Sequence, residues 1–161
     1  CSIDGTDKQQ EWQRAPSIWS QIVSNLEALS SVVDWIIVSI TVTPLTLESF
    51  AGLSTWLNQA TLPNLLIGQP SIVQDPDPLS PIPWYGVYRE EIGYMVKLLE
   101  SGKILPANPT IPEYFTNWYQ NNNQPTQQQK KDLVCFLEKQ RNLWSLDDWR
   151  IVYPKLAELC K

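Results

Sequence analysis

The sequence contains no histidine, and this absence removes several common kinds of active site. Without histidine there is no Ser–His or Cys–His nucleophile pair, and a frequent general base and metal ligand is missing. The six glycines stand apart, so no Gly-rich phosphate-binding loop is present, and no Gly-x-Ser-x-Gly motif occurs. We therefore expect no catalytic residues, no metal and no cofactor, and a protein that is not an enzyme.

Charged residues are also scarce, at 18% of the chain, and they are unevenly distributed. Residues 1–125 carry five basic and twelve acidic side chains, whereas residues 126–161 carry seven basic and five acidic ones. Binding to a phosphate backbone requires clustered Lys and Arg, so nucleic acid is not an expected partner. The mildly basic C-terminal part is typical of a solvated helix face.

Two pairs of neighbouring acids, Glu90/Glu91 and Asp147/Asp148, are the candidates for carboxylate acid–base chemistry. Adjacent positions on a helix point about 100° apart, so neither pair converges by itself. Asp147 and Asp148 are better explained as first-turn acids at a helix N-terminus, and Glu90 and Glu91 as a solvated face. A hydrolase is therefore the third class of function, after two kinds of binding protein.

Long hydrophobic runs are missing as well. The longest apolar stretch, Val32 to Val42, is interrupted by Asp34 and falls short of the ~18–20 residues that a membrane-spanning helix needs. We therefore expect no transmembrane segment.

The chain begins with Cys1, followed by a polar stretch that reads Ser-Ile-Asp-Gly-Thr-Asp-Lys-Gln-Gln. This start resembles a bacterial lipoprotein after removal of its signal peptide. The resemblance implies acylation of Cys1, which anchors stably when two or three chains are attached, and a flexible tether over residues 1–15. It also implies export, with the protein anchored on the periplasmic or extracellular side of a membrane, or in the thylakoid lumen of a photosynthetic organism. The alternatives are an arbitrary chain boundary and the ordinary N-terminus of an exported protein.

Cys135 and Cys160 are the remaining cysteines. In an oxidising compartment they are candidates for a disulfide that links the last two helices. The alternative is a pair of buried, inert thiols. Zinc binding is not expected, because the chain has no histidine and no Cys-x-x-Cys pair.

The apolar spacing predicts an all-α fold, an irregular bundle of about six helices. Between residues 19 and 40, apolar side chains recur at steps of three and four residues, as in an amphipathic helix. Thr126 is a suitable N-cap, Gly102 is suited to end a helix, and Pro154 is expected to kink or split the last helix. Residues 32–43 are rich in β-branched side chains and are also compatible with a strand. The expected helices cover residues 16–43, 46–59, 85–101, 113–120, 126–142 and 146–160.

Prolines are concentrated in the middle of the chain. Six of the thirteen prolines fall within residues 61–84, where they fix φ and remove backbone donors. This predicts a long, extended connection over residues 69–83, which divides a helical pair, 16–68, from a helical bundle, 84–161. Residues 16–161 together are expected to form one domain.

The aromatic residues cluster after this connection, with twelve of the seventeen at or beyond residue 84. Trp and Tyr are enriched at protein interfaces, so Trp84, Tyr85 and Tyr88 are the candidate partner-binding residues, with Trp84 as the anchor. The alternative is that the proline-rich segment packs back onto its own helices, with Trp84 in the core.

These features favour a non-enzymatic, lipid-anchored accessory protein that binds other proteins of a membrane-associated complex. The alternative function is a binding module for an apolar or carbohydrate ligand, held between aromatic-rich helices.

The anchor can be tested on native material. If Cys1 is acylated, the native protein partitions into the detergent phase, and mass spectrometry finds extra mass on its N-terminal peptide. An unmodified N-terminal peptide from native material would contradict the lipoprotein resemblance and the localisation that follows from it.

Overall fold

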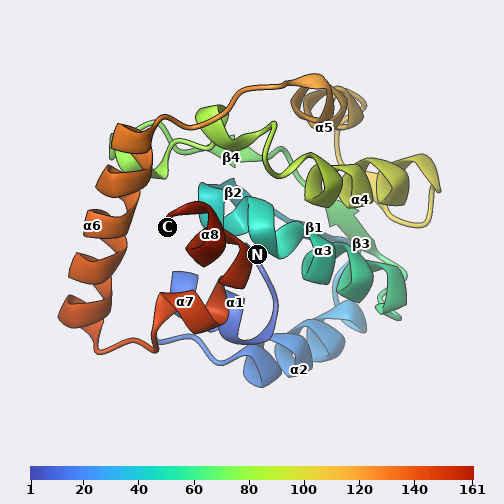
Figure 1. Cartoon of the computed structure of the whole chain (residues 1–161). Coiled ribbons are helices and arrows are strands. Elements are labelled where there is room, and N and C mark those ends of the chain that lie inside the picture. Colours follow the sequence, from blue (N-terminus) through green and yellow to red (C-terminus); the bar gives the residue numbers. More distant parts are fainter.

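The computed structural model describes all residues, 1–161, and shows a mixed α/β fold (Figure 1). The expected all-α bundle of about six helices is wrong, because segments between the helices pair as parallel strands. The elements are α1 (Asp7–Gln13), α2 (Trp19–Ser30), β1 (Ile36–Val38), β2 (Thr41–Val42), α3 (Pro44–Gln59), β3 (Leu65–Ile67), β4 (Ser71–Ile72), the 3-10 helices η1 (Asp77–Leu79) and η2 (Ile82–Trp84), α4 (Arg89–Glu100), β5 (Leu105–Pro106), α5 (Ile111–Gln120), α6 (Gln127–Trp144), α7 (Trp149–Val152) and α8 (Pro154–Leu159).

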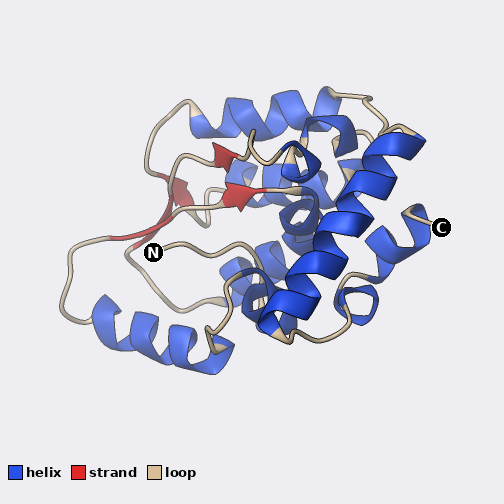
Figure 2. Cartoon of the chain, turned by 90° about the vertical axis from the view of Figure 1, so that its left-hand side faces the viewer, coloured by secondary structure: helices blue, strands red, loops and turns tan.

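The strands form two small parallel sheets. The larger sheet has the order β1-β3-β5, with Ile37 in register with Leu66, and Leu66 in register with Leu105. The smaller sheet pairs β2 with β4. Figure 2 shows the strands together on one side of the molecule, with most of the helices on the other side.

The first two strands arise from the β-branched stretch. The side chains of Ile36, Val38 and Ile40 are buried, while Ile37 between them is 44% exposed. This period of two is that of a strand, and β-branched side chains favour it. Helix α2 ends at Ser30, so the predicted helix 16–43 is wrong beyond that residue, and the strand alternative for residues 32–43 is confirmed.

Local signals placed the other helices well. Helices predicted over 46–59, 113–120 and 126–142 are confirmed as α3, α5 and α6 with small shifts of their ends. Thr126 and Gln129 form a capping box at the start of α6. Gly102 has a positive φ of 68° after α4, and Pro154 separates α7 from α8.

Helix α3 lies at the centre of the molecule, with ten of its sixteen residues buried. It packs against α4, which packs in turn against α5. One hydrophobic core of 32 residues runs from Ile3 to Leu156. Residues on both sides of the proline-rich segment therefore share a single core.

The N-terminal segment is part of this core and is not the flexible tether predicted over residues 1–15. Ile3 is fully buried, and its N–H donates to the carbonyl of Ser39 at 3.0 Å. Trp12, in α1, is buried as well, and its indole N–H donates to the carbonyl of Asp147 at 3.0 Å. Burying these two apolar side chains favours an ordered segment over a solvated one.

The proline-rich segment packs onto the protein rather than projecting from it. It contains β4, η1 and η2, and it leads directly into the core. Trp84, Tyr85 and Tyr88 are 1%, 3% and 0% exposed, so the prediction that they contact a partner is corrected. The structure shows the alternative, a proline-rich segment that packs back with Trp84 in the core. Trp84 is buried and stacks on Tyr88, with ring centroids 6.4 Å apart.

The three cysteines are unpaired, and the predicted disulfide between Cys135 and Cys160 is not formed. Leu133 and Leu137 are the two buried residues of α6. Cys135, two residues from each of them, therefore points away from the core and is exposed. Cys160 is half-buried at the end of α8, where desolvation raises the pKa of its thiol.

We expect Trp84→Ala to destabilise the fold strongly, because it removes a fully packed ring. Such changes cost about 3–5 kcal/mol, which corresponds to a fall of roughly 10 °C in melting temperature for a chain of this size. Ile82→Ala, in the same segment but 43% exposed, is the matched control and should change the melting temperature little. Equal effects of the two variants in thermal denaturation would contradict the core position of Trp84.

Candidate functional site

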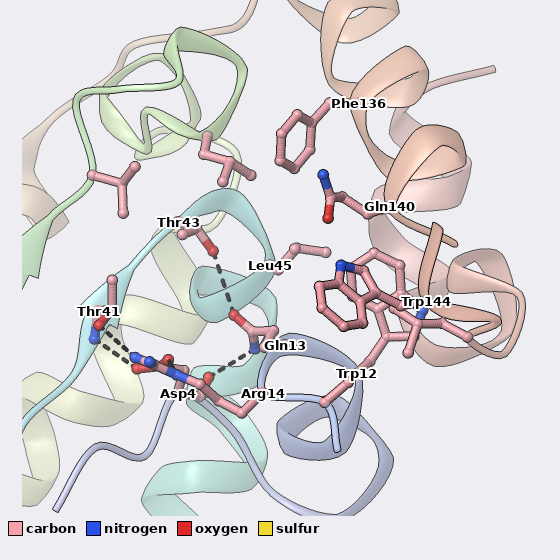
Figure 3. A pocket seen from close by; sticks show the side chains of 14 residues that line it. Asp4, Trp12, Gln13, Arg14, Thr41, Thr43, Leu45, Phe136, Gln140 and Trp144 are labelled. Atoms are coloured by element: carbon pink, nitrogen blue, oxygen red, sulfur yellow. Dashed lines mark hydrogen bonds and ion pairs between the residues drawn. The ribbon is translucent and has the colours of Figure 1, made fainter. Parts of the chain in front are cut away.

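A pocket of about 440 Å³ lies between α6 and the layer formed by α1, β2 and the start of α3 (Figure 3). This volume is within the range of small-ligand sites, roughly 300–1,000 Å³. One end of the pocket is polar and the other is apolar. The lining residues are Asp4, Trp12, Gln13, Arg14, Ala15, Thr41, Thr43, Leu45, Val73, Leu79, Phe136, Gln140, Trp144 and Leu146.

The polar end is organised by the carboxylate of Asp4. Its Oδ2 accepts a hydrogen bond from Arg14 Nε at 2.6 Å, and its Oδ1 accepts one from the backbone N–H of Thr41 at 2.7 Å. Arg14 Nη2 donates to Ser2 Oγ at 2.7 Å and to Thr41 Oγ1 at 2.8 Å. Because the Asp4 side chain is only 4% exposed, this pairing offsets the cost of burying its charge.

One donor group at this end remains free. Arg14 Nη1 makes no hydrogen bond within the chain, whereas Nε and Nη2 are both engaged, and the side chain is 39% exposed. The neighbouring amide of Gln13 is occupied: its Nε2 donates to the Asp4 carbonyl at 3.0 Å, and its Oε1 accepts from Thr46 Oγ1 at 2.9 Å. Arg14 is therefore the group at the polar end that is able to bind a ligand oxygen.

The opposite wall is one face of α6. Phe136, Gln140 and Trp144 recur every four residues, so they lie one above another on the helix. Figure 3 shows them on the α6 side of the pocket, with Leu45 and Thr43 across from them. This spacing is visible in the sequence, but only the position of α6 in the fold shows that the three residues line a pocket.

The α6 wall has few partners of its own. Trp144 is 60% exposed, and neither its indole N–H nor the Gln140 amide makes a hydrogen bond within the chain. An exposed indole beside a half-buried phenyl ring offers a flat apolar surface with polar groups at its margin. The wall therefore suits the ring or short chain of a small molecule.

Hydrogen bonds and ion pairs attach helix α6 to α7. Trp149 Nε1 donates to Glu138 Oε1 at 3.0 Å, and Arg150 pairs with Glu138 at 2.6 Å. The Trp149 hydrogen bond, followed by the Arg150 bond and charge, lowers the pKa of Glu138. Arg141 of α6 also lies 3.8 Å from Asp148, the residue that caps α7.

A second polar cluster surrounds Glu48, away from the pocket. Its carboxylate accepts the backbone N–H groups of Lys155 at 3.0 Å and Leu156 at 2.7 Å, and so caps the start of α8. It also accepts the Tyr88 hydroxyl at 3.2 Å. Desolvation raises the pKa of Glu48. Its carboxylate joins α3 to Tyr88 and to the start of α8, which favours a structural role.

The acids singled out from the sequence do not converge. Glu90 is exposed and accepts the Tyr94 hydroxyl at 3.2 Å, whereas Glu91 is buried and pairs with Lys155 at 2.5 Å. Asp148 caps α7 through the backbone N–H of Arg150. Neither Glu90 with Glu91 nor Asp147 with Asp148 lines a shared pocket, so these two pairs give no support to hydrolase chemistry.

Of the residues predicted to form a site, none lines the pocket. Cys1 is exposed, Cys135 and Cys160 lie elsewhere, and the aromatic trio at 84, 85 and 88 is in the core. Sequence reasoning missed Asp4 and Arg14, whose pairing depends on the fold. It also missed Glu48, for which a signal existed: it is the only charged residue in the sixteen of α3.

No protein family, curated protein sequence or solved structure matches the chain. No three potential metal-binding side chains lie together. None of the helices combines the length and the apolar character needed to cross a bilayer.

The buried carboxylate of Glu48 gives a pH-dependent prediction. Its pKa is raised above the ordinary 4.5, so its contribution to stability is fully present below about pH 4.5 and is lost as the pH rises through the raised pKa. Glu48→Gln abolishes this titration. We expect the melting temperature of the wild type, relative to the variant, to fall between acidic and neutral pH.

Glu90→Gln, which removes an exposed carboxylate on α4, controls for the loss of one charge. Thermal denaturation of all three proteins in one pH series checks the prediction. A wild-type advantage that grows toward neutral pH would contradict the role of desolvation at Glu48.

Proposed function

We propose that the protein is a non-enzymatic binding module, and that it holds a small, uncharged amphipathic molecule in the pocket between α6 and α1. One observation carries the proposal: the pocket joins an unengaged guanidinium nitrogen to an aromatic wall that has no partner of its own. Ligand sites are mostly apolar, with a few polar groups that orient the ligand, and this pocket has that composition.

The charges favour a neutral ligand. The Arg14 charge is already balanced by Asp4 at 2.6 Å, and two of its three nitrogens are engaged. A carboxylate is bound best by a bidentate contact, which requires two free nitrogens. A single carbonyl or hydroxyl oxygen fits the one nitrogen that remains.

The apolar part of the ligand is set by the α6 wall. A flat ring or a short chain between Leu45, Phe136 and Trp144 buries the exposed face of the indole. The Gln140 amide, which lies between the two aromatic positions on α6, supplies both a donor and an acceptor. This arrangement supports the apolar-ligand function inferred from the aromatic composition, although on different aromatic residues.

The lipid-anchored accessory role remains a prediction. Cys1 is exposed, as acylation requires. The partner surface assigned to that role consisted of Trp84, Tyr85 and Tyr88, which are buried, so it no longer supports the proposal.

Prodan, an uncharged naphthalene that carries a carbonyl group, is a suitable probe for the pocket. We expect saturable binding with a blue-shifted emission, because the naphthalene leaves water. Trp144→Ala should weaken binding about tenfold, the equivalent of roughly 1.4 kcal/mol, by removing the apolar wall. Its folding should be unaffected, because Trp144 is 60% exposed.

Leu143→Ala is the matched control, since Leu143 is 65% exposed on the same helix but does not line the pocket. An analogue of prodan without the carbonyl should bind several-fold more weakly if Arg14 is its partner. Absence of saturable binding, or equal binding by the Trp144 and Leu143 variants, would refute the proposed function.

A further inference from the structure

The larger sheet leaves one of its faces uncovered. Parallel sheets are normally buried on both faces. Here Ile37, Leu66 and Leu105 lie in register across the three strands, and Ile37 and Leu105 are 44% and 57% exposed. On β1, the two neighbours of Ile37, Ile36 and Val38, are buried and point to the opposite face.

This apolar row continues beyond the strands. Trp35, two residues before Ile37 and on the same face, is 62% exposed. Together with Leu66, Leu105 and Lys103 it lines a shallow hollow of about 390 Å³ at the start of the strands. We call this surface, formed by residues 35, 37, 66 and 105, the outer sheet face. It shares no residue with the ligand pocket.

Two opposite charges lie at the end of the outer sheet face where its strands begin. Lys103 lines the hollow, and Asp34 is exposed at the bend just before β1. Asp34 precedes β1 and Lys103 precedes β5, so the two residues lie at opposite edges of the sheet and at the same end of its parallel strands. Neither takes part in any of the nine ion pairs, which run from Lys8–Glu11 to Lys161–Glu158. The surface therefore has an unpaired negative edge and an unpaired positive edge.

We infer that a second copy of this chain covers the outer sheet face. A two-fold axis parallel to the strands places β1 of one copy over β5 of the other, with the two sheets aligned as in a sandwich. Asp34 of each copy then faces Lys103 of the other, so both unpaired charges are matched, twice. The same operation brings Trp35 of each copy over the hollow beside Leu105 of the other.

Other modes of covering the face fit less well. Pairing through the sheet edge is disfavoured because Pro106, in the edge strand β5, has no backbone N–H to donate. An anionic lipid surface is disfavoured by the net charge of −5. A face-to-face dimer satisfies both the apolar row and the two charged edges.

Charge reversal tests this geometry directly. We expect sedimentation to show a reversible dimer in the micromolar range, and Asp34→Lys or Lys103→Asp alone to raise its dissociation constant about tenfold. The double variant, Asp34→Lys with Lys103→Asp, should restore the wild-type dissociation constant to within a few-fold. Asp34, Lys103 and Trp35 are exposed, so the variants should fold normally.

Glu113→Lys, the same charge change at an exposed site on α5, is the matched control and should leave the dimer unchanged. Trp35→Ala should weaken the dimer without lowering the melting temperature. A wild type that stays monomeric up to about 100 µM overturns the inference. So does a dimer in which the double reversal is no better than the singles.

A vesicle experiment tests the remaining alternative, in which a lipid surface covers the outer sheet face. If monomeric protein co-sediments with uncharged phosphatidylcholine vesicles and Trp35→Ala abolishes this, the outer sheet face binds lipid, and the dimer is overturned. We expect no such co-sedimentation.

Discussion

The buried side chain of Asp4 joins three parts of the chain that are distant in sequence. Its carboxylate binds Arg14 at the end of α1 and the backbone of Thr41 at the start of β2. Its own N–H donates to Gln10, and its carbonyl accepts from Gln13. Each polar group of this residue is thus satisfied within the protein, which offsets its desolvation. Asp4 therefore attaches the N-terminal segment to β2 and, with Arg14, forms the polar end of the ligand pocket.

The helices with strong local signals could be predicted from the sequence. Of the strands, only the segment of β1 and β2 was indicated, as an alternative to a helix, and β3, β4 and β5 were not. Capping by Thr126 and interruption by Pro154 act within a few residues, so they survive any tertiary context. The stretch around Ile36 and Ile40 is different, because steps of four satisfy both the helical period and the period of two. Parallel pairing with β3, contributed by residues far along the chain, decided between the two readings.

The same distinction explains what could be predicted of the sites. Aromatic enrichment after residue 84 was real, but composition does not distinguish a buried Trp84 from an exposed Trp144. The polar composition of residues 1–15 suggested a tether, because the contacts of Ile3 with Ser39 and of Asp4 with Thr41 join residues more than 30 positions apart. Glu48 was missed although its signal is local, since one charge in an otherwise uncharged helix marks a buried, satisfied position.

The attachment of α6 has a consequence for how a ligand exchanges. Only Leu133 and Leu137 of its eighteen residues are buried, and Val134 and Phe136 are partly buried against the core. Glu138 and Arg141 add polar contacts with α7. A helix with so little buried apolar surface opens locally at a lower free-energy cost than the core around α3. Helix α6, which forms one wall of the pocket, is then also the element that opens it. We therefore expect the residence time of a bound molecule to depend on how often α6 opens locally.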